Sequence, residues 1–210
     1  MPRPRALIVG PGRAVAVLSI TQILGWGMLI YPPVLMMPHI AAERGWSLAF
    51  CMSGLSVALA TSGLLSPTSC GLIDHYGGGR VMSLGALTGM AGMIGLALAD
   101  QWQVYLLCWL LIGAAMSSTL YDPAFTTLTR IFGAAARRQI TLVTFAGGFA
   151  STVGWPVTHL LLAHFGWRGT YIGFAVVLGL VVAPLHAFAL PRARAPEAAA
   201  PPQAGAAPAP

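Results

Sequence analysis

Asp122 and Pro123 stand side by side inside a long apolar stretch, and their chemistry is the most specific in the sequence. An ionised carboxylate inside an apolar helix costs about 2.5–3.5 kcal/mol on insertion scales, so such groups usually face water or a partner. Pro123 has no amide hydrogen, so the carbonyl of Thr119 loses its usual helical donor. Together they predict a polar site for a proton, a cation or a hydrogen-bond donor. The alternative is structural, with Asp122 bonded to a neighbouring hydroxyl or to the indole of Trp26.

Other chemistry-bearing residues do not form an enzyme site. No glycine-rich phosphate loop follows a strand pattern, and no Ser/His/Asp set lies outside the apolar stretches. Cys51, Cys70 and Cys108 are an odd number, lack paired spacing and each sit in an apolar run, which excludes a disulfide framework and a zinc motif. We therefore expect no enzyme activity, no metal and no cofactor.

The composition indicates that lipid surrounds these residues. The chain has 210 residues, of which 57% are hydrophobic and 8% charged, whereas a soluble domain has about 25% charged residues. All 11 basic residues are arginines, and the net charge is +6. Because so little charge cannot cover a water-facing surface, a soluble enzyme or a nucleic-acid-binding protein is excluded.

Six apolar segments are long enough to cross a bilayer, which takes about 20 residues each. They are unbroken runs and lack the alternation of barrel strands. The sequence thus predicts an all-α membrane protein with six transmembrane helices, at residues 14–39, 47–73, 81–98, 103–129, 140–163 and 170–190.

The arginines predict the orientation. With the N-terminus in the cytoplasm, the outer loops hold only Arg44 and Arg168, and the other nine arginines lie inside. This positive-inside bias predicts a multi-pass inner (plasma) membrane protein with both termini cytoplasmic. Residues 1–13 would be a cytoplasmic tail, and the Ala/Pro-rich residues 191–210 a disordered tail or the start of a linker.

Small and polar residues recur at helical spacing in the first, second, fourth and fifth segments. Such faces usually contact protein rather than lipid. The third and sixth segments carry glycines with few polar side chains, so we expect them to brace a cavity lined by the other four. The alternative is that each stripe is a packing device. The stripes include Ser19, Gln22 and Trp26; Ser56, Gly63, Pro67 and Asp74; Ser118, Asp122 and Thr126; and Thr144, Gly148, Ser151, Trp155 and His159.

Residues 71–80, GLIDHYGGGR, resemble the loop signature of the major facilitator superfamily, in its expected place between the second and third helices. Further stretches resemble a bacterial branch related to monocarboxylate and oxalate/formate carriers. These are Trp26-Gly27 with Tyr31, residues 45–47, residues 120–125, and residues 147–152 followed by Trp155-Pro156.

The resemblance implies a gate at the cytoplasmic side. The matching aspartate, Asp74, would meet a helix N-terminus and nearby arginines, with Arg130 and Arg80 as the expected partners. Gly71, Gly77, Asp74, Arg80 and Arg130 are the predicted gating residues. His75, Gly78 and Gly79 stand where the family usually has basic residues, so the gate would be weaker, or modulated by pH through His75.

The resemblance also implies a secondary transporter that works by alternating access. Such carriers have two six-helix halves, each a 3+3 inverted repeat, with the substrate between them. This chain would supply one half, binding a small organic solute, an organic anion, through Trp26, Tyr121, Asp122 and Trp155. It would pair with itself as a homo-dimer or with a second six-helix half. The alternative is a truncated, non-transporting membrane protein or assembly subunit.

Overall fold

The computed structural model describes residues 11–190, and every described element is helical. The predicted tail at residues 191–210 and most of the predicted tail at 1–13 lie outside the described residues. Pro11–Arg13 already belong to the first helix, which therefore begins three residues before the predicted segment.

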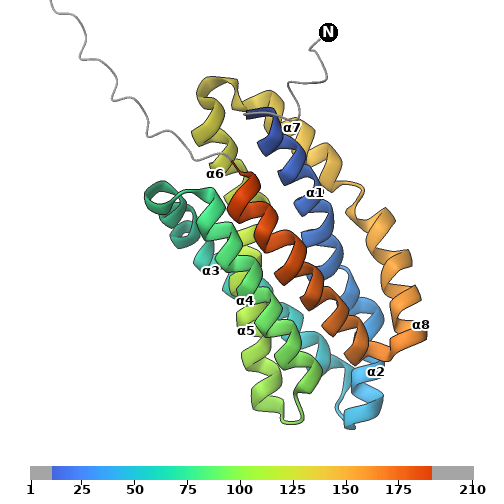
Figure 1. Cartoon of the computed structure of the whole chain (residues 1–210). Coiled ribbons are helices and arrows are strands. Elements are labelled where there is room, and N and C mark those ends of the chain that lie inside the picture. The colour runs from blue at the N-terminus through green and yellow to red at the C-terminus, as the bar shows by residue number, and fades with distance from the viewer. Residues whose placement is uncertain (1–10, 191–210) are drawn as a thin grey trace, which may run out of the picture.

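The helices form one elongated bundle (Figure 1). In chain order they are α1 (Pro11–Leu29), α2 (Pro32–Arg44), α3 (Leu48–Tyr76), α4 (Gly78–Leu98), α5 (Trp102–Thr119), α6 (Tyr121–Phe132), the 3₁₀ turn η2 (Gly133–Ala135), α7 (Ala136–Gly147), α8 (Ala150–Val177) and the π-helical stretches η3 (Leu178–Val182) and η4 (Leu185–Ala189).

Four helical stretches of the described residues are long and apolar enough to cross a membrane, namely Gly12–Arg44, Leu48–Tyr76, Gly78–Leu98 and Trp102–Ala189. The last has 88 residues and would measure about 130 Å if straight, far more than a bilayer. Leu120 interrupts it without reversing the chain, and the chain then turns back at Gly133 and at Gly166, where φ is +54° and +66°. The sharp reversal within α8 lies at one end of the bundle in Figure 1.

The connection between α3 and α4 corrects the predicted loop. Residues 71–76 are helical and α4 begins at Gly78, so Gly77 is the whole connection. Its φ of +85° is a conformation that side chains with a Cβ rarely adopt. Asp74 therefore lies in the last turn of α3 and Arg80 in the first turn of α4, on rigid helix ends rather than in a flexible loop.

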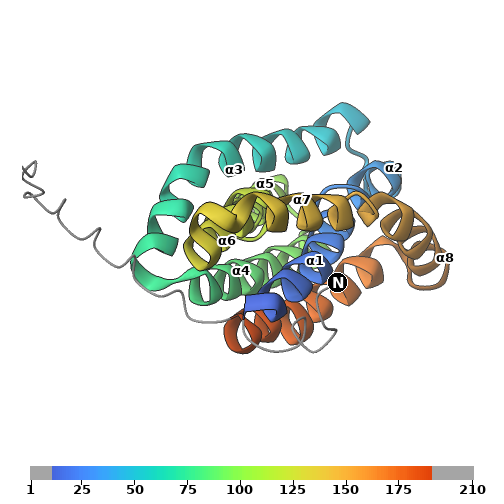
Figure 2. The ribbon, with the colours of Figure 1, turned by 90° about the horizontal axis from the view of Figure 1, so that it is seen from above.

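Small residues let the helices approach closely. Gly154 of α8 faces Gly27 of α1, and a Cβ on Gly154 would lie 2.9 Å from the Cα of Gly27. Gly113 of α5 similarly meets Ala58 of α3. Seen from above in Figure 2, α3 runs along one edge of the bundle and the C-terminal helix along the opposite edge.

Charged side chains join three helix ends at the end of the bundle away from Gly77. Arg168 forms an ion pair with Glu43 at 2.8 Å, and Arg44 forms one with Asp100 at 2.5 Å. Trp167 donates its indole N–H to Glu43 over 2.6 Å and is only 5% exposed. This cluster fixes the loops to each other and to the end of α4, where both arginines also donate to backbone carbonyls.

Candidate functional site

The helix break at Leu120 places the residues with the most specific chemistry. Leu120 has ψ −151°, which ends α5 at Thr119 and starts α6 at Tyr121. Pro123 cannot donate to the carbonyl of Thr119, as the sequence predicted. The result is a new helix N-terminus in the middle of an apolar stretch, with Asp122 in its first turn.

Gln22 of α1 occupies the gap that Pro123 leaves. Its side-chain amide donates to the carbonyl of Thr119 at 2.8 Å and to that of Leu120 at 3.2 Å. Its own carbonyl oxygen accepts the indole N–H of Trp26 at 3.2 Å. Gln22 is fully buried, so this bridge fixes the α5–α6 break against α1 and orients the Trp26 ring.

Asp122 bonds to a hydroxyl, which is the structural alternative that the sequence left open. Ser66 of α3 donates its hydroxyl to the Asp122 carboxylate. The positive end of the α6 dipole also favours a carboxylate in the first turn, by about 0.3–1 kcal/mol. Asp122 is nevertheless exposed, so the carboxylate keeps open sides that a ligand can reach.

A pocket of about 320 Å³ lies against this carboxylate. Its lining comes from α1, α3, α5 and α6, plus Ile30 just after α1 and Leu120 at the break: Trp26, Ile30, Leu59, Ser62, Met116, Leu120, Tyr121, Asp122 and Pro123. Asp122 is the one carboxylate among these nine residues, and none of them is basic. The predicted cavity thus has walls from the first, second and fourth segments, whereas residues of the fifth do not line this pocket.

Two aromatic rings flank the pocket. The rings of Trp26 and Tyr121 lie 4.8 Å apart, and Tyr121 stacks on Phe125 at 5.1 Å. The Tyr121 hydroxyl approaches the carbonyl of Thr144 on α7 at 3.5 Å. Gly147 leaves room for that hydroxyl, because a Cβ there would lie 2.3 Å from it.

Trp155 lies apart from the other three predicted binding residues. It follows Gly154, whose backbone packs on α1, and its own side chain is 37% exposed on α8. It does not line the pocket beside Asp122. The structure therefore groups Trp26, Tyr121 and Asp122 and leaves Trp155 on an open face.

Asp74 and Arg130 meet at the other predicted site. The guanidinium of Arg130, in the last turn of α6, donates to the Asp74 carboxylate at 2.8 Å. The side chain of Arg130 is 16% exposed and that of Asp74 is 59% exposed. The ion pair joins the C-terminal ends of α3 and α6 in this half of the bundle.

The glycines near this pair have different roles. Gly78 packs on Thr127 of α6, with only 2.0 Å available between an added Cβ and the Thr127 hydroxyl oxygen. A Cβ added to Gly79 would lie 2.8 Å from the carbonyl oxygen of His186. Side chains at these positions would collide with neighbouring helices, which explains why basic residues are missing there. A Cβ on Gly71, by contrast, would meet no atom within 4 Å.

Ser62 and Ser66 are site residues that sequence reasoning missed. The predicted face of this helix ran through Gly63, Pro67 and Asp74, one position further along. One residue is about 100° of helix rotation, so the stripe of Ser62, Ser66 and Ser69 occupies a different part of the α3 surface. There Ser66 meets Asp122 of α6 and Ser69 meets Ser117 of α5. The i, i+4, i+7 spacing of three serines was the available signal.

Comparison with known proteins shows which family this chain resembles. Residues 15–210 match the model of the Major Facilitator Superfamily. Monocarboxylate transporter 11 of Homo sapiens is 31% identical over 152 residues, which cover 70% of this chain and 31% of that protein.

Monocarboxylate transporter 11 of Mus musculus is 30% identical over the same length, covering 70% of this chain and 33% of that protein. The chain thus spans about a third of the length of these curated relatives. No solved structure matches it.

Proposed function

This chain belongs to the major facilitator superfamily, and on that premise we propose that it acts in secondary transport of a small organic anion by alternating access. The observation that carries the proposal is the pocket beside Asp122, at a helix break between two helices. Broken helices whose N-termini point at a ligand are a recurring device of secondary transporters. The names of the two relatives support a monocarboxylate as the solute.

Charge balance at the pocket makes the proposal specific. An ionised Asp122 would repel an organic anion, and no basic residue among the described lining offsets it. Like charges at close range in a medium of low dielectric are strongly unfavourable. We infer that the anion enters beside Asp122 only after the carboxylate has been neutralised, and a proton is the simplest neutralising ion. Asp122 would thereby couple solute movement to a proton gradient.

The same proposal groups the helices into six crossings. They are residues 11–44, 48–76, 78–98, 102–132, 136–165 and 167–189, so each crossing ends at a described break or turn. This arrangement fits one 3+3 half of a carrier with its Gly77 end in the cytoplasm. The Asp74–Arg130 pair would then be a cytoplasmic gate contact, with Gly77 as its rigid turn and Gly71 and Arg80 beside it.

The exposed face of α3 favours a partner for this half. Only 17% of the most apolar 18-residue segment of α3 is buried, whereas 39–56% of the corresponding segments in the other three stretches is buried. A second six-helix half or a second copy of this chain would supply the missing wall. A membrane protein that folds without moving solute is the competing function.

Reconstituted uptake tests the proposal. The full chain is inserted into proteoliposomes, and uptake of a labelled monocarboxylate is measured with and without an inward proton gradient. We expect saturable accumulation that the gradient drives. Asp122→Asn should lower that accumulation by more than about tenfold, because the amide cannot take up and release the proton.

Asp100→Asn is the matched control. It makes the same chemical change at a carboxylate that is 75% exposed, pairs with Arg44 and does not line the pocket. We expect its uptake to stay within about twofold of the unmodified chain, because an exposed ion pair contributes only about 0.2–1 kcal/mol. Equal uptake by Asp122→Asn and Asp100→Asn would contradict the coupling role. Absence of flux in the unmodified chain under every gradient would favour the non-transporting alternative.

A further inference from the structure

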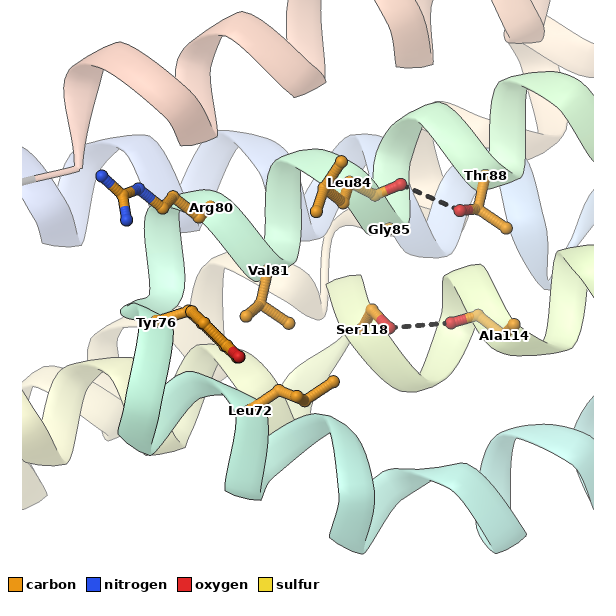
Figure 3. A pocket seen from close by; sticks show the side chains of 9 residues that line it. All are labelled: Leu72, Tyr76, Arg80, Val81, Leu84, Gly85, Thr88, Ala114 and Ser118. Atoms are coloured by element: carbon orange, nitrogen blue, oxygen red, sulfur yellow. Dashed lines mark hydrogen bonds between the residues drawn. The ribbon is translucent and has the colours of Figure 1, made fainter.

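A second pocket, of about 370 Å³, opens between the C-terminal part of α3 and the N-terminal half of α4 (Figure 3). It is separate from the pocket beside Asp122, and the two share no lining residue. It is a groove lined by Leu72, Tyr76, Arg80, Val81, Leu84, Gly85, Thr88, Ala114 and Ser118. The lining thus includes Arg80, one of the predicted gating residues.

The deep part of this groove presents hydrocarbon. The Thr88 hydroxyl donates to the carbonyl of Leu84 at 3.0 Å, and the Ser118 hydroxyl to that of Ala114 at 2.9 Å, as the dashed lines in Figure 3 show. Both hydroxyls are therefore engaged within the protein, and that of Ser118 also lies 3.2 Å from the Ser69 hydroxyl of α3. Leu72 and Leu84 are 41% and 65% exposed along the edges. The groove is suited to an apolar chain rather than to a polar solute.

The shallow end is polar and basic. Arg80 is exposed, and no acidic side chain within residues 11–190 pairs with it, because Asp74 pairs with Arg130 instead. In Figure 3 the Arg80 guanidinium lies at this end and points away from the apolar residues, while the Tyr76 ring reaches into the groove. One unpaired cation above an apolar groove matches a molecule with an anionic head and a hydrocarbon tail.

We propose that this groove binds an anionic phospholipid, with its phosphate at Arg80 and one acyl chain between α3 and α4. Basic pockets between membrane helices are known to hold acidic head groups. Arg80 and Thr88 are eight residues apart, a rise of about 12 Å, which is close to the depth of one leaflet at about 15 Å. The groove therefore has the length and polarity of a lipid site, and the inference does not depend on transport.

Lipid titration of the purified chain tests this proposal. The protein, delipidated in mild detergent, is titrated with phosphatidylglycerol or with phosphatidylcholine carrying the same acyl chains, and bound lipid is counted by native mass spectrometry. We expect one phosphatidylglycerol bound about fivefold more tightly than phosphatidylcholine, the factor for one arginine at an anionic surface. Arg80→Gln should abolish this preference, and Arg80→Lys should retain most of it.

Two further variants separate head-group binding from other effects. Arg137→Gln removes another exposed arginine, one outside the groove, and should leave the preference unchanged. Thr88→Phe fills the deep groove and should weaken binding of both lipids. Equal binding of the two lipids by the unmodified chain, or equal effects of the Arg80→Gln and Arg137→Gln substitutions, would overturn the proposal. A lipid-free dimer with the groove buried between copies would overturn it as well.

Discussion

Asp122 and Asp74 are both helix-borne carboxylates, and their partners give them different chemistry. Asp74 has a cation at 2.8 Å, so its negative charge is matched within the described part of the chain. Asp122 has a hydroxyl and a helix N-terminus, which supply hydrogen bonding but no full positive charge. An intramembrane carboxylate without a cationic partner is costly unless a coupling ion or an aqueous path compensates its charge. The coupling role is therefore proposed for Asp122 and the gating role for Asp74.

Exchanging the charges of Asp74 and Arg130 tests the gate contact. Because Asp74 is largely exposed, the pair should contribute only about 0.2–1 kcal/mol to stability, so the single changes should fold. We expect Asp74→Arg and Arg130→Asp each to lower proteoliposome uptake, and the double variant to recover a substantial part of it. A double variant as inactive as either single one, with melting temperatures unchanged, would contradict the gate contact.

At the scale of elements, single residues at helix ends position both candidate sites. Leu120 and Pro123 divide one predicted span into α5 and α6, and Gln22 closes the resulting gap from α1. Gly77 turns the chain in one residue, so α3 and α4 hold their ends rigidly. The last helix differs from the predicted regular span, since η3 and η4 have π-helical bonding.

Gly78 and Gly71 give a matched test of helix packing at this end. Gly78→Ala places a Cβ against Thr127 and should destabilise the protein by about 1–3 kcal/mol, the usual cost of overpacking. Gly71→Ala meets no atom and should be neutral or stabilising by up to about 1 kcal/mol, because alanine favours the helix. Unfolding in mixed micelles of mild detergent and dodecyl sulfate measures both. Equal losses of stability would show that the two glycines do not differ as the packing indicates.

At the scale of the whole molecule, the two ends of the bundle carry different charges. Arg44 and Arg168 at one end are paired with Glu43 and Asp100. The end with Gly77 carries the exposed Arg80, and the first turn of α7 carries the exposed Arg137 and Arg138. Unpaired arginines at one end are what the positive-inside rule predicts for a cytoplasmic surface.

Cysteine labelling of intact cells tests this orientation. In a background with Cys51, Cys70 and Cys108 replaced by alanine, new cysteines are placed at Ala134 and at Asp100, both of which are exposed. A membrane-impermeant maleimide should label Asp100→Cys in intact cells. It should label Ala134→Cys only after the membrane has been permeabilised. The reverse pattern would contradict cytoplasmic termini.

Much of the architecture follows from the sequence. Long apolar runs predicted membrane helices, and the motif at residues 71–80 indicated the family that the comparison then showed. Pro123 predicted the freed carbonyl of Thr119. The family resemblance suggested Arg130 and Arg80 as partners of Asp74, and the structure pairs Asp74 with Arg130. These features depend on local chemistry, namely hydropathy, a missing N–H and the scarcity of acids and bases in an apolar chain.

The sequence alone therefore determined which residues are costly in lipid and must find partners, and roughly where the helices run. Only the tertiary structure decided which partner each one finds. Ser66 rather than Gly63 or Pro67 faces Asp122, Gln22 closes the helix break, and Arg80 remains available at the edge of a groove. The physical reason is rotation: one residue turns a helix face by about 100°, and that angle is set by contacts with distant helices, such as Gly27 on Gly154.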